Sequence, residues 1–199
     1  MRTGVHPIET ASYTILRERL DTSDLPPLTR AVVERVVHTS ADPSWAGDLV
    51  CTEDALRAGR DALSAGAPLI TDVRMVAAGI TGYPTTVALD LAAPDAATIP
   101  GGTRSAAGIR AAVTAHPDGA VWVVGNAPTA LAELVRCAQA GLVVAPLVIG
   151  LPVGFVGAVA AKAALRASGL PAVSNRSERG GAAVAAAAVN ALIYARSRA

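Results

Sequence analysis

The sequence predicts a three-layer α/β fold, in which helices cover both faces of an open sheet of about five parallel strands. Short apolar runs alternate along the 199 residues with alanine-rich segments of helical length. Several runs are continuously apolar, such as residues 121–124 and 143–149, as in strands that are buried on both faces of a parallel sheet. Neither an internal repeat nor a low-complexity linker divides the chain, so we expect one domain over residues 1–199.

The composition indicates a globular protein with an aliphatic core. Hydrophobic residues make up 52% of the chain and the mean hydropathy is +0.42, which excludes intrinsic disorder. Aromatic residues contribute only 3%, so alanine, valine, leucine and isoleucine must fill the interior. The net charge of +1 and the isoelectric point of about 7.9 argue against a nucleic-acid-binding protein and against a polybasic membrane anchor.

The apolar runs give the expected strands, which cover residues 68–73, 85–91, 120–125, 143–150 and, more weakly, 171–175. Pro146 cannot donate a hydrogen bond to a neighbouring strand, so it can mark the true start of the fourth strand. The expected helices cover residues 8–20, 24–38, 52–65, 75–78, 105–115, 127–140, 156–168 and 181–196. Thr52 is suited to cap the third helix and Gly66 to end it, and residues 91–102 should form a long exposed loop.

Cysteine usage and the N-terminus indicate the compartment. Cys51 and Cys137 stand 86 positions apart, with neither a CxxC spacing nor a neighbouring histidine, which favours buried free thiols in a reducing compartment. Residues 1–10 lack the apolar stretch of a secretory signal, so we expect a cytoplasmic protein. Residues 142–161 are uncharged and long enough to span a bilayer, but two prolines and three glycines interrupt them. Those interruptions would leave backbone groups unsatisfied in lipid, so we expect no membrane span.

His38 is the first candidate catalytic residue. It follows a run of valines in a predicted amphipathic helix and precedes the helix-breaking residues 39–43. The partial negative charge at a helix C-terminus favours the imidazolium form, which is a proton donor. A structural histidine at a helix end fits the same pattern, and His6 and His116 show still weaker signals.

Two glycine-led helix starts are candidate anion sites. In residues 101–105, Arg104 and Ser105 stand beside the free N–H groups of a helix N-terminus, which suits a carboxylate or a phosphate. A solvated loop arginine fits the same local pattern. Near the chain end, residues 175–181 place Arg176 before a pair of glycines and the last helix. Together with the glycine-led helix start at residues 150–158, the two segments indicate a ligand with several anionic groups.

Residues 150–158 form a glycine-rich turn between a strand and a helix. Their G-x-x-x-G-x-x-G spacing matches neither the dinucleotide fingerprint nor the Walker loop. Glycines such as Gly154 let the backbone approach a large flat ligand closely, and Lys162 follows one and a half turns into the next helix.

Six motifs in one order support a family resemblance. They are E-R-V-V-H at 34–38, A-G-A-P-L-I-T-D-V-R-M-V-A-A-G-I at 65–80, T-R-S-A-A at 103–107, G-N-A-P-T-A-L at 125–131, P-V-G-F-V-G-A at 152–158, and G-G at 180–181 with A-A-A-V-N-A-L at 186–192. Together they resemble the precorrin-8X methylmutase family over nearly the whole chain, from about residue 7 to residue 192.

The resemblance implies an isomerase of cobalamin biosynthesis. Such an enzyme moves a methyl group from C-11 to C-12 of precorrin-8X or cobalt-precorrin-8, giving hydrogenobyrinate or cobyrinate. It also implies a flavodoxin-like fold, a homodimer, and a reaction that needs no metal or redox cofactor from the protein. His38 matches the family's catalytic histidine, which protonates the macrocycle. The residues expected to bind the polycarboxylate substrate are Ser12, Thr81, Arg104, Ser105, Gly154, Lys162 and Arg176.

Several positions depart from the family's pattern. Glu178 places a negative charge where a substrate carboxylate would lie, Ala160 replaces a glutamate, and Arg74 replaces an acidic residue. A non-catalytic corrinoid carrier therefore stays open as an alternative. A flavin or dinucleotide oxidoreductase is weaker, because the dinucleotide fingerprint and its ribose-binding acid are missing. The sequence leaves open whether the substrate carries cobalt.

Overall fold

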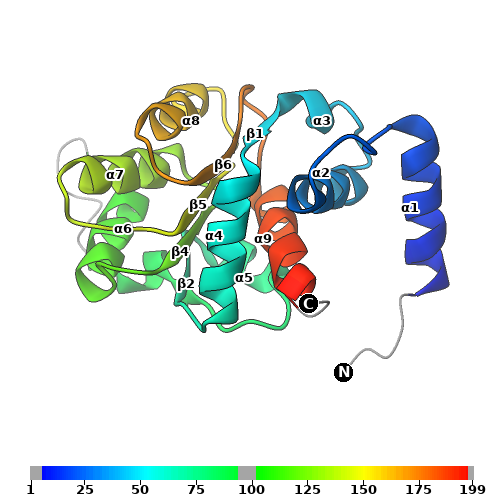
Figure 1. The fold of residues 1–199 in the computed structure, drawn as a ribbon. Coiled ribbons are helices and arrows are strands. Elements are labelled where there is room, and N and C mark those ends of the chain that lie inside the picture. Colours follow the sequence, from blue (N-terminus) through cyan, green and yellow to red (C-terminus); the bar gives the residue numbers. More distant parts are fainter. Residues whose placement is uncertain (1–5, 94–101, 197–199) are drawn as a thin grey trace.

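The computed structural model describes residues 6–93 and 102–196 and is built around a six-stranded sheet (Figure 1). The strands are β1 (Leu49–Cys51), β2 (Leu69–Thr71), β3 (Thr86–Val87), β4 (Val121–Val124), β5 (Leu147–Gly150) and β6 (Ala172–Asn175). Their order across the sheet is β1-β6-β5-β4-β2-β3, and all neighbours are parallel except β1 and β6. Counted along the chain, the five parallel strands have the order 2-1-3-4-5, which is the flavodoxin-like order that the family resemblance implies.

Helices cover both faces of this sheet, which confirms the predicted three layers. They are α1 (Pro7–Arg19), α2 (Pro27–Ser40), α3 (Trp45–Asp48), α4 (Glu53–Ser64), α5 (Arg74–Gly79), α6 (Arg104–Ala115), α7 (Pro128–Gln139), α8 (Ala158–Ala167) and α9 (Ala182–Arg196), with a 3₁₀ turn η1 at Ala88–Leu91. Helices α4 and α9 lie on one face, with α2 packed against them, and α6, α7 and α8 lie on the other (Figure 1).

The continuous apolar runs are explained by burial on both faces. In β4, Val121 and Val123 belong to the apolar cluster that includes α4 and α9. Trp122 and Val124 point the other way, into the cluster that includes α6 and α7. All four side chains are at most 1% exposed, so every position of this strand must be apolar.

Two short elements were not predicted from the sequence. Strand β1 and helix α3 follow one another in residues 45–51, where one helical turn and three strand residues are too short to show a periodicity. Strand β1 pairs antiparallel with β6, as Val50 with Ser174. The sheet is therefore mixed, and the expectation of a wholly parallel sheet is wrong at this edge.

The strand expected at 85–91 is wrong beyond Val87. Its ladder with β2 ends there, and the chain turns into η1, which packs on α6. A Cβ on Gly108 of α6 would lie 2.5 Å from the carbonyl oxygen of Ala88, so the missing side chain makes room for this turn. Most of the predicted loop at 91–102 lies outside the described residues.

Other local expectations are confirmed. Strand β5 begins directly after Pro146, and the Thr52 hydroxyl caps α4 by accepting a hydrogen bond from the N–H of Ala55 at 3.3 Å. Gly66 follows α4 with a φ of 85°, a conformation that favours glycine. In the described part of the chain, no helix has the length and hydrophobicity needed to span a bilayer.

Candidate active site

His38 lies in the last turn of α2, where α1 packs against it. Its Nδ1 atom and the hydroxyl of Ser12 share a hydrogen bond of 2.8 Å. The ring of Tyr13 stacks on the imidazole, with centroids 4.8 Å apart and planes inclined by 8°. His38 is half-buried, and its Nε2 has no hydrogen-bond partner among the residues that the structure describes. This nitrogen is therefore free to exchange a proton with a bound ligand.

Arg35 holds the aromatic ring that stacks on His38. It precedes His38 by one turn of α2 and pairs with Glu9, with 2.9 Å between Nη1 and Oε1. The same Nη1 lies 3.5 Å from the Tyr13 hydroxyl, and the guanidinium lies 4.8 Å from the ring centre of Tyr194. Burial raises the pKa of Tyr13, so this phenol stays neutral at physiological pH.

Thr81 follows α5 and is held by α9. Its backbone N–H donates to Asn190 Oδ1 at 3.1 Å, and its hydroxyl is hydrogen-bonded to the hydroxyl of Tyr194. Arg35 of α2 packs on that same tyrosine ring. Thr81 is therefore connected to the helix that carries His38 through Tyr194 and Arg35. The structure thus brings Ser12, His38 and Thr81 to one side of the molecule.

Asp72 lies at the carboxyl end of β2 and binds the turn that follows the neighbouring strand β4. In this strand order the chain changes direction between β2 and β4, and ligands of such folds bind at the carboxyl ends of the strands there. Asp72 directly follows β2 and accepts backbone N–H groups of Gly125 (3.1 Å), Asn126 (2.9 Å) and Ala127 (2.9 Å). Burial raises the pKa of Asp72, and these three donors counteract the rise. The turn that leads into α7 is fixed as a result.

Arg104 and Ser105 are the first two residues of α6. The hydroxyl of Thr103 caps this helix, accepting from the N–H of Ala106 at 3.1 Å, and lies 2.9 Å from the hydroxyl of Thr129 in α7. The N-termini of α6 and α7 are therefore neighbours. Arg104 is exposed and has neither an ion pair nor a hydrogen bond within the described ranges. Gly101, the start of the predicted anion loop, lies outside them.

The loop after β5 borders the N-terminus of α7. Gly154 has a φ of 151° and Gly157 a φ of 79°, both of which favour glycine. A Cβ at either glycine would lie within 3.8 Å of Pro128. Between the glycines, Phe155 is 96% exposed and Val156 is 88% exposed. The loop therefore offers an apolar surface beside close backbone, which suits a flat macrocycle.

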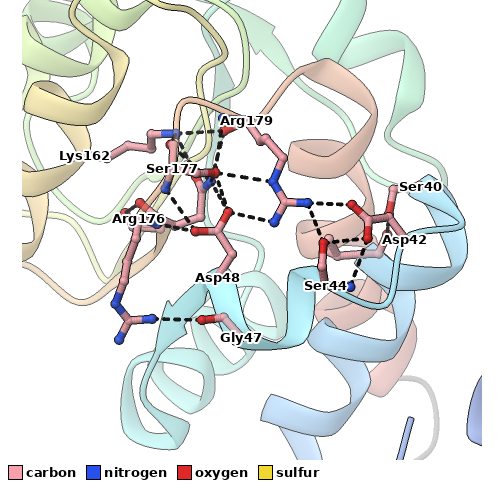
Figure 2. Close-up of polar contacts among 12 residues, drawn as sticks. Ser40, Asp42, Ser44, Gly47, Asp48, Lys162, Arg176, Ser177 and Arg179 are labelled. Carbon is pink, nitrogen blue, oxygen red and sulfur yellow. Dashed lines mark hydrogen bonds and ion pairs between the residues drawn. The ribbon is translucent and has the colours of Figure 1, made fainter. Parts of the chain in front are cut away.

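Lys162 is placed differently from the prediction, as Figure 2 shows. Its side chain is fully buried, and its ammonium donates to Asn175 Oδ1 (2.8 Å) and to the carbonyl oxygens of Ser177 (2.5 Å) and Arg179 (2.8 Å). Burial lowers the pKa of Lys162 to about 8, so the amine is still protonated at neutral pH. A substrate carboxylate could reach this ammonium only if one of the three bonds broke, which argues against the predicted substrate contact.

Asp48 binds residues 175–179, which also supply the acceptors of Lys162, from the opposite side (Figure 2). Its carboxylate accepts hydrogen bonds from Asn175 Nδ2 (2.9 Å), the N–H of Arg176 (2.9 Å), the N–H and hydroxyl of Ser177 (2.9 and 2.6 Å) and the guanidinium of Arg179 (3.1 Å). Burial alone would raise the pKa of Asp48, but these donors outweigh it and hold the pKa well below its usual range. The carboxylate is therefore ionised at every physiological pH.

The side chain of Arg176 is exposed, and one of its nitrogens donates to the carbonyl oxygen of Gly47 at 3.1 Å. The other guanidinium donors have no hydrogen bond among the described residues. Arg176 therefore stays a candidate for a substrate carboxylate, unlike its buried neighbour Asn175.

Comparisons with known proteins identify the family. The family model described as precorrin-8X methylmutase matches residues 7–195. The chain belongs to the precorrin-8X methylmutase family. A cobalt-precorrin-8 methylmutase of Methanothermobacter thermautotrophicus is 38% identical over 190 residues, which cover 94% of this chain and 92% of that protein. A precorrin-8X methylmutase of Pseudomonas aeruginosa is 40% identical over 190 residues, 91% of each chain.

A solved structure extends the comparison to three dimensions. The precorrin-8X methyl mutase of Thermus thermophilus matches this fold with a TM-score of 0.85 at 32% identity and covers 96% of each chain. The methylmutase family expected from the sequence is thus confirmed, and with it the assignment to an isomerase of cobalamin biosynthesis. The alternative of a non-catalytic corrinoid carrier is not supported by these comparisons.

Several residues that build this methylmutase site were missed in the sequence. Tyr13 adjoins Ser12, and Arg35 precedes His38 by three positions, so helical spacing was a usable signal for both. Asp48 gave no such signal, because its donors lie about 130 positions later in the chain.

Proposed function

We propose that the chain moves a methyl group from C-11 to C-12 of precorrin-8X or cobalt-precorrin-8, with His38 as the proton donor. The arrangement of the imidazole carries this proposal: Ser12 engages Nδ1 and Tyr13 covers one ring face, while Nε2 has no partner among the described residues. In the imidazolium, Nδ1–H donates to the Ser12 hydroxyl and Nε2–H is the transferable proton. The neutral ring left after transfer keeps its proton on Nδ1, so no change of tautomer is needed.

The proton acts on the electron distribution of the macrocycle. Protonation by Nε2 draws electron density from the bonds around the migrating methyl group and lowers the barrier to the shift. Because the reaction is an isomerisation, the same nitrogen takes a proton back as product forms. His38 lies in the last turn of α2 and presents this nitrogen to the bound macrocycle throughout the cycle.

We assign recognition of the substrate's carboxylates to the helix starts near the carboxyl ends of the strands. Arg104 and the N–H groups near Ser105 form one anion site, and Arg176 forms a second. Gly154 lets the macrocycle approach the backbone, and Thr81 lies on the His38 side. The net charge of only +1 gives weak long-range steering, so these local contacts must supply the recognition.

Conversion of two substrates tests the proposed reaction and identifies the natural one. The purified protein is incubated with precorrin-8X and, in parallel, with cobalt-precorrin-8, and the visible spectrum is followed. We expect conversion of at least one to hydrogenobyrinate or cobyrinate. Tight binding of both corrinoids without conversion of either would contradict the proposal and favour a carrier.

Replacement of Arg104 by alanine should weaken the binding of hydrogenobyrinate by about 10- to 100-fold, as expected for a lost hydrogen bond to a charged group. Arg104→Lys should recover only part of this affinity, because lysine restores the charge without the two-pronged geometry. Absorbance or fluorescence titration measures both effects. Arg57, which pairs with Asp54 on the surface of α4, provides the control Arg57→Ala, for which we expect no change. Equal affinities for all four proteins would remove Arg104 from the site.

We also propose that the chain acts as a homodimer. The apolar side chains of Phe155 and Val156 are almost fully exposed, and such surfaces often mark an interface. Light scattering should give a particle of about twice the chain mass of 20.0 kDa. Bound corrinoid should raise its melting temperature through linkage. A fully active monomer would refute this assembly.

We further infer that residues 1–199 form one methylmutase domain that acts in the cytoplasm. The family match over residues 7–195 supports the single domain. Both cysteines are free, and burial raises the pKa of Cys51 to about 11, as suits unreactive thiols in a reducing compartment.

A further inference from the structure

Lys162 is exceptional in the sequence as well as in the structure. The chain has seventeen lysine and arginine residues, and Lys162 is the only lysine. Three oxygen atoms surround its amine in a fully buried space. A compact ammonium with three tetrahedral donors fits such a space, whereas a planar guanidinium with five donors does not. The position therefore requires the particular geometry of lysine and not only a positive charge.

The ammonium determines how the loop at 176–181 is folded. Carbonyl groups 177 and 179 of this loop point inward to Lys162, while carbonyl 178 points the other way and accepts the N–H of Gly154 at 3.1 Å. Gly180 packs directly on the segment before Gly154, since a Cβ there would lie 2.3 Å from the carbonyl oxygen of Leu151. The loop is thus fixed between α8 and the glycine-rich turn after β5.

The same loop reaches the helix that carries His38. The guanidinium of Arg179 bonds to the carboxylate of Asp42 at 2.5 Å and to the hydroxyl of Ser44 at 2.8 Å (Figure 2). It also lies over the ring of Trp45, 4.7 Å from its centre. Since α2 ends at Ser40, these contacts hold the chain immediately after the catalytic helix.

We propose that Lys162 is a positioning residue for the methyl shift. By binding carbonyls 177 and 179 it sets the loop at 176–181, and this loop sets the position of the Gly154 turn relative to the His38 helix. The role rests on the proposed function, in which the Gly154 turn and the His38 helix both border the bound corrinoid. Lys162 sets how these two parts lie relative to one another. It acts through the loop and makes no contact with substrate.

Nuclear magnetic resonance on the wild-type protein tests this role without any variant. Because Lys162 is the only lysine, lysine labelled with ¹⁵N at Nζ gives a single side-chain signal. We expect ammonium protons that exchange slowly with water and a signal that hydrogenobyrinate leaves in place. Rapid exchange, or a large change on adding hydrogenobyrinate, would overturn the proposal, because the amine would then be exposed or would contact the ligand.

Variants test the coupling between the amine and the loop. Lys162→Met keeps an unbranched, flexible side chain that is one atom shorter, and it removes all three donors. In the absence of corrinoid, it should speed amide hydrogen exchange at Gly154 and across residues 176–181 by about tenfold or more, and it should weaken hydrogenobyrinate binding by a similar factor. Lys162→Arg should restore neither property, since the guanidinium does not fit the three acceptors.

A matched control separates this effect from a general loss of stability. Val113 is buried near the C-terminal end of α6, outside this polar cluster, so Val113→Ala should lower the melting temperature and leave exchange at Gly154 and product affinity unchanged. Unchanged exchange and affinity in Lys162→Met, or full restoration by Lys162→Arg, would overturn the proposal. Exchange is measured without corrinoid, so this result stands apart from the turnover assay that tests the methyl shift itself.

Discussion

Replacement of His38 by alanine should lower the turnover of precorrin-8X by about 10²- to 10⁴-fold, the usual contribution of general acid catalysis. The affinity for hydrogenobyrinate should stay within a few-fold, because the imidazole contributes a proton and not a carboxylate contact. Single-turnover spectroscopy with saturating enzyme measures the first quantity, and titration measures the second. Circular dichroism should show an unchanged fold, since His38 is only half-buried.

His116 provides the matched control for this prediction. His116 caps the C-terminus of α6 and precedes the loop that leads into β4, whereas His38 lies in the last turn of α2. His116→Ala should therefore turn over at the wild-type rate. If His38→Ala were folded and as active as the wild type, His38 could not be the proton donor.

Replacement of Asp48 by alanine should lower the free energy of unfolding by about 3 kcal/mol, because it leaves buried hydrogen-bond donors of Asn175 and Ser177 without their acceptor and removes the negative charge that favours the buried Lys162 ammonium. For a chain of this length, the melting temperature should fall by roughly 6–12 °C. Asp54 is the control: its side chain is 92% exposed and pairs with Arg57 on the surface of α4. Asp54→Ala should change stability by less than about 0.5 kcal/mol.

The contribution of Asp48 to the free energy of unfolding should decrease as the pH falls. Its pKa is lower in the folded state than in the unfolded chain, so its stabilisation is fully present above the usual aspartate pKa of about 4. It is lost progressively as the pH falls below that value. The stability gap between the wild type and Asp48→Asn, measured by urea unfolding, should therefore narrow between pH 5 and pH 3. A gap that stays constant over this range would show that the ionised carboxylate is not the stabilising form.

The fold was predictable wherever burial imposes a long pattern. Strands such as β4 and β5 are buried on both faces, and their apolar runs stand out from any neighbouring sequence. The edges of the sheet were not predictable in this way. Strand β1 has three residues, and β3 ends after two because the next residues turn to pack on α6. Such boundaries depend on tertiary packing, which no local pattern records.

The candidate site was predictable to the extent that local sequence determines it. His38 at a helix end and Arg104 at a helix start were identified from their neighbours, and the structure places both at helix ends as expected. Lys162 was misjudged, because its position in a glycine-led helix resembles an anion site. Its acceptors lie 13 to 17 residues later in the chain, and only the folded loop brings them to its amine.

The pairing of β1 with β6 has a consequence for assembly. A long unpaired strand rich in valine and isoleucine is a template for adding strands from other molecules, and so for aggregation and fibrils. Here β1 covers the outer edge of β6, and at the opposite edge β3 gives way to a helical turn after two residues. Within the residues that the structure describes, neither border leaves a long run of free backbone groups. We therefore expect other molecules to meet this protein through its helices and loops, while its most hydrophobic segments stay closed to edge-to-edge association.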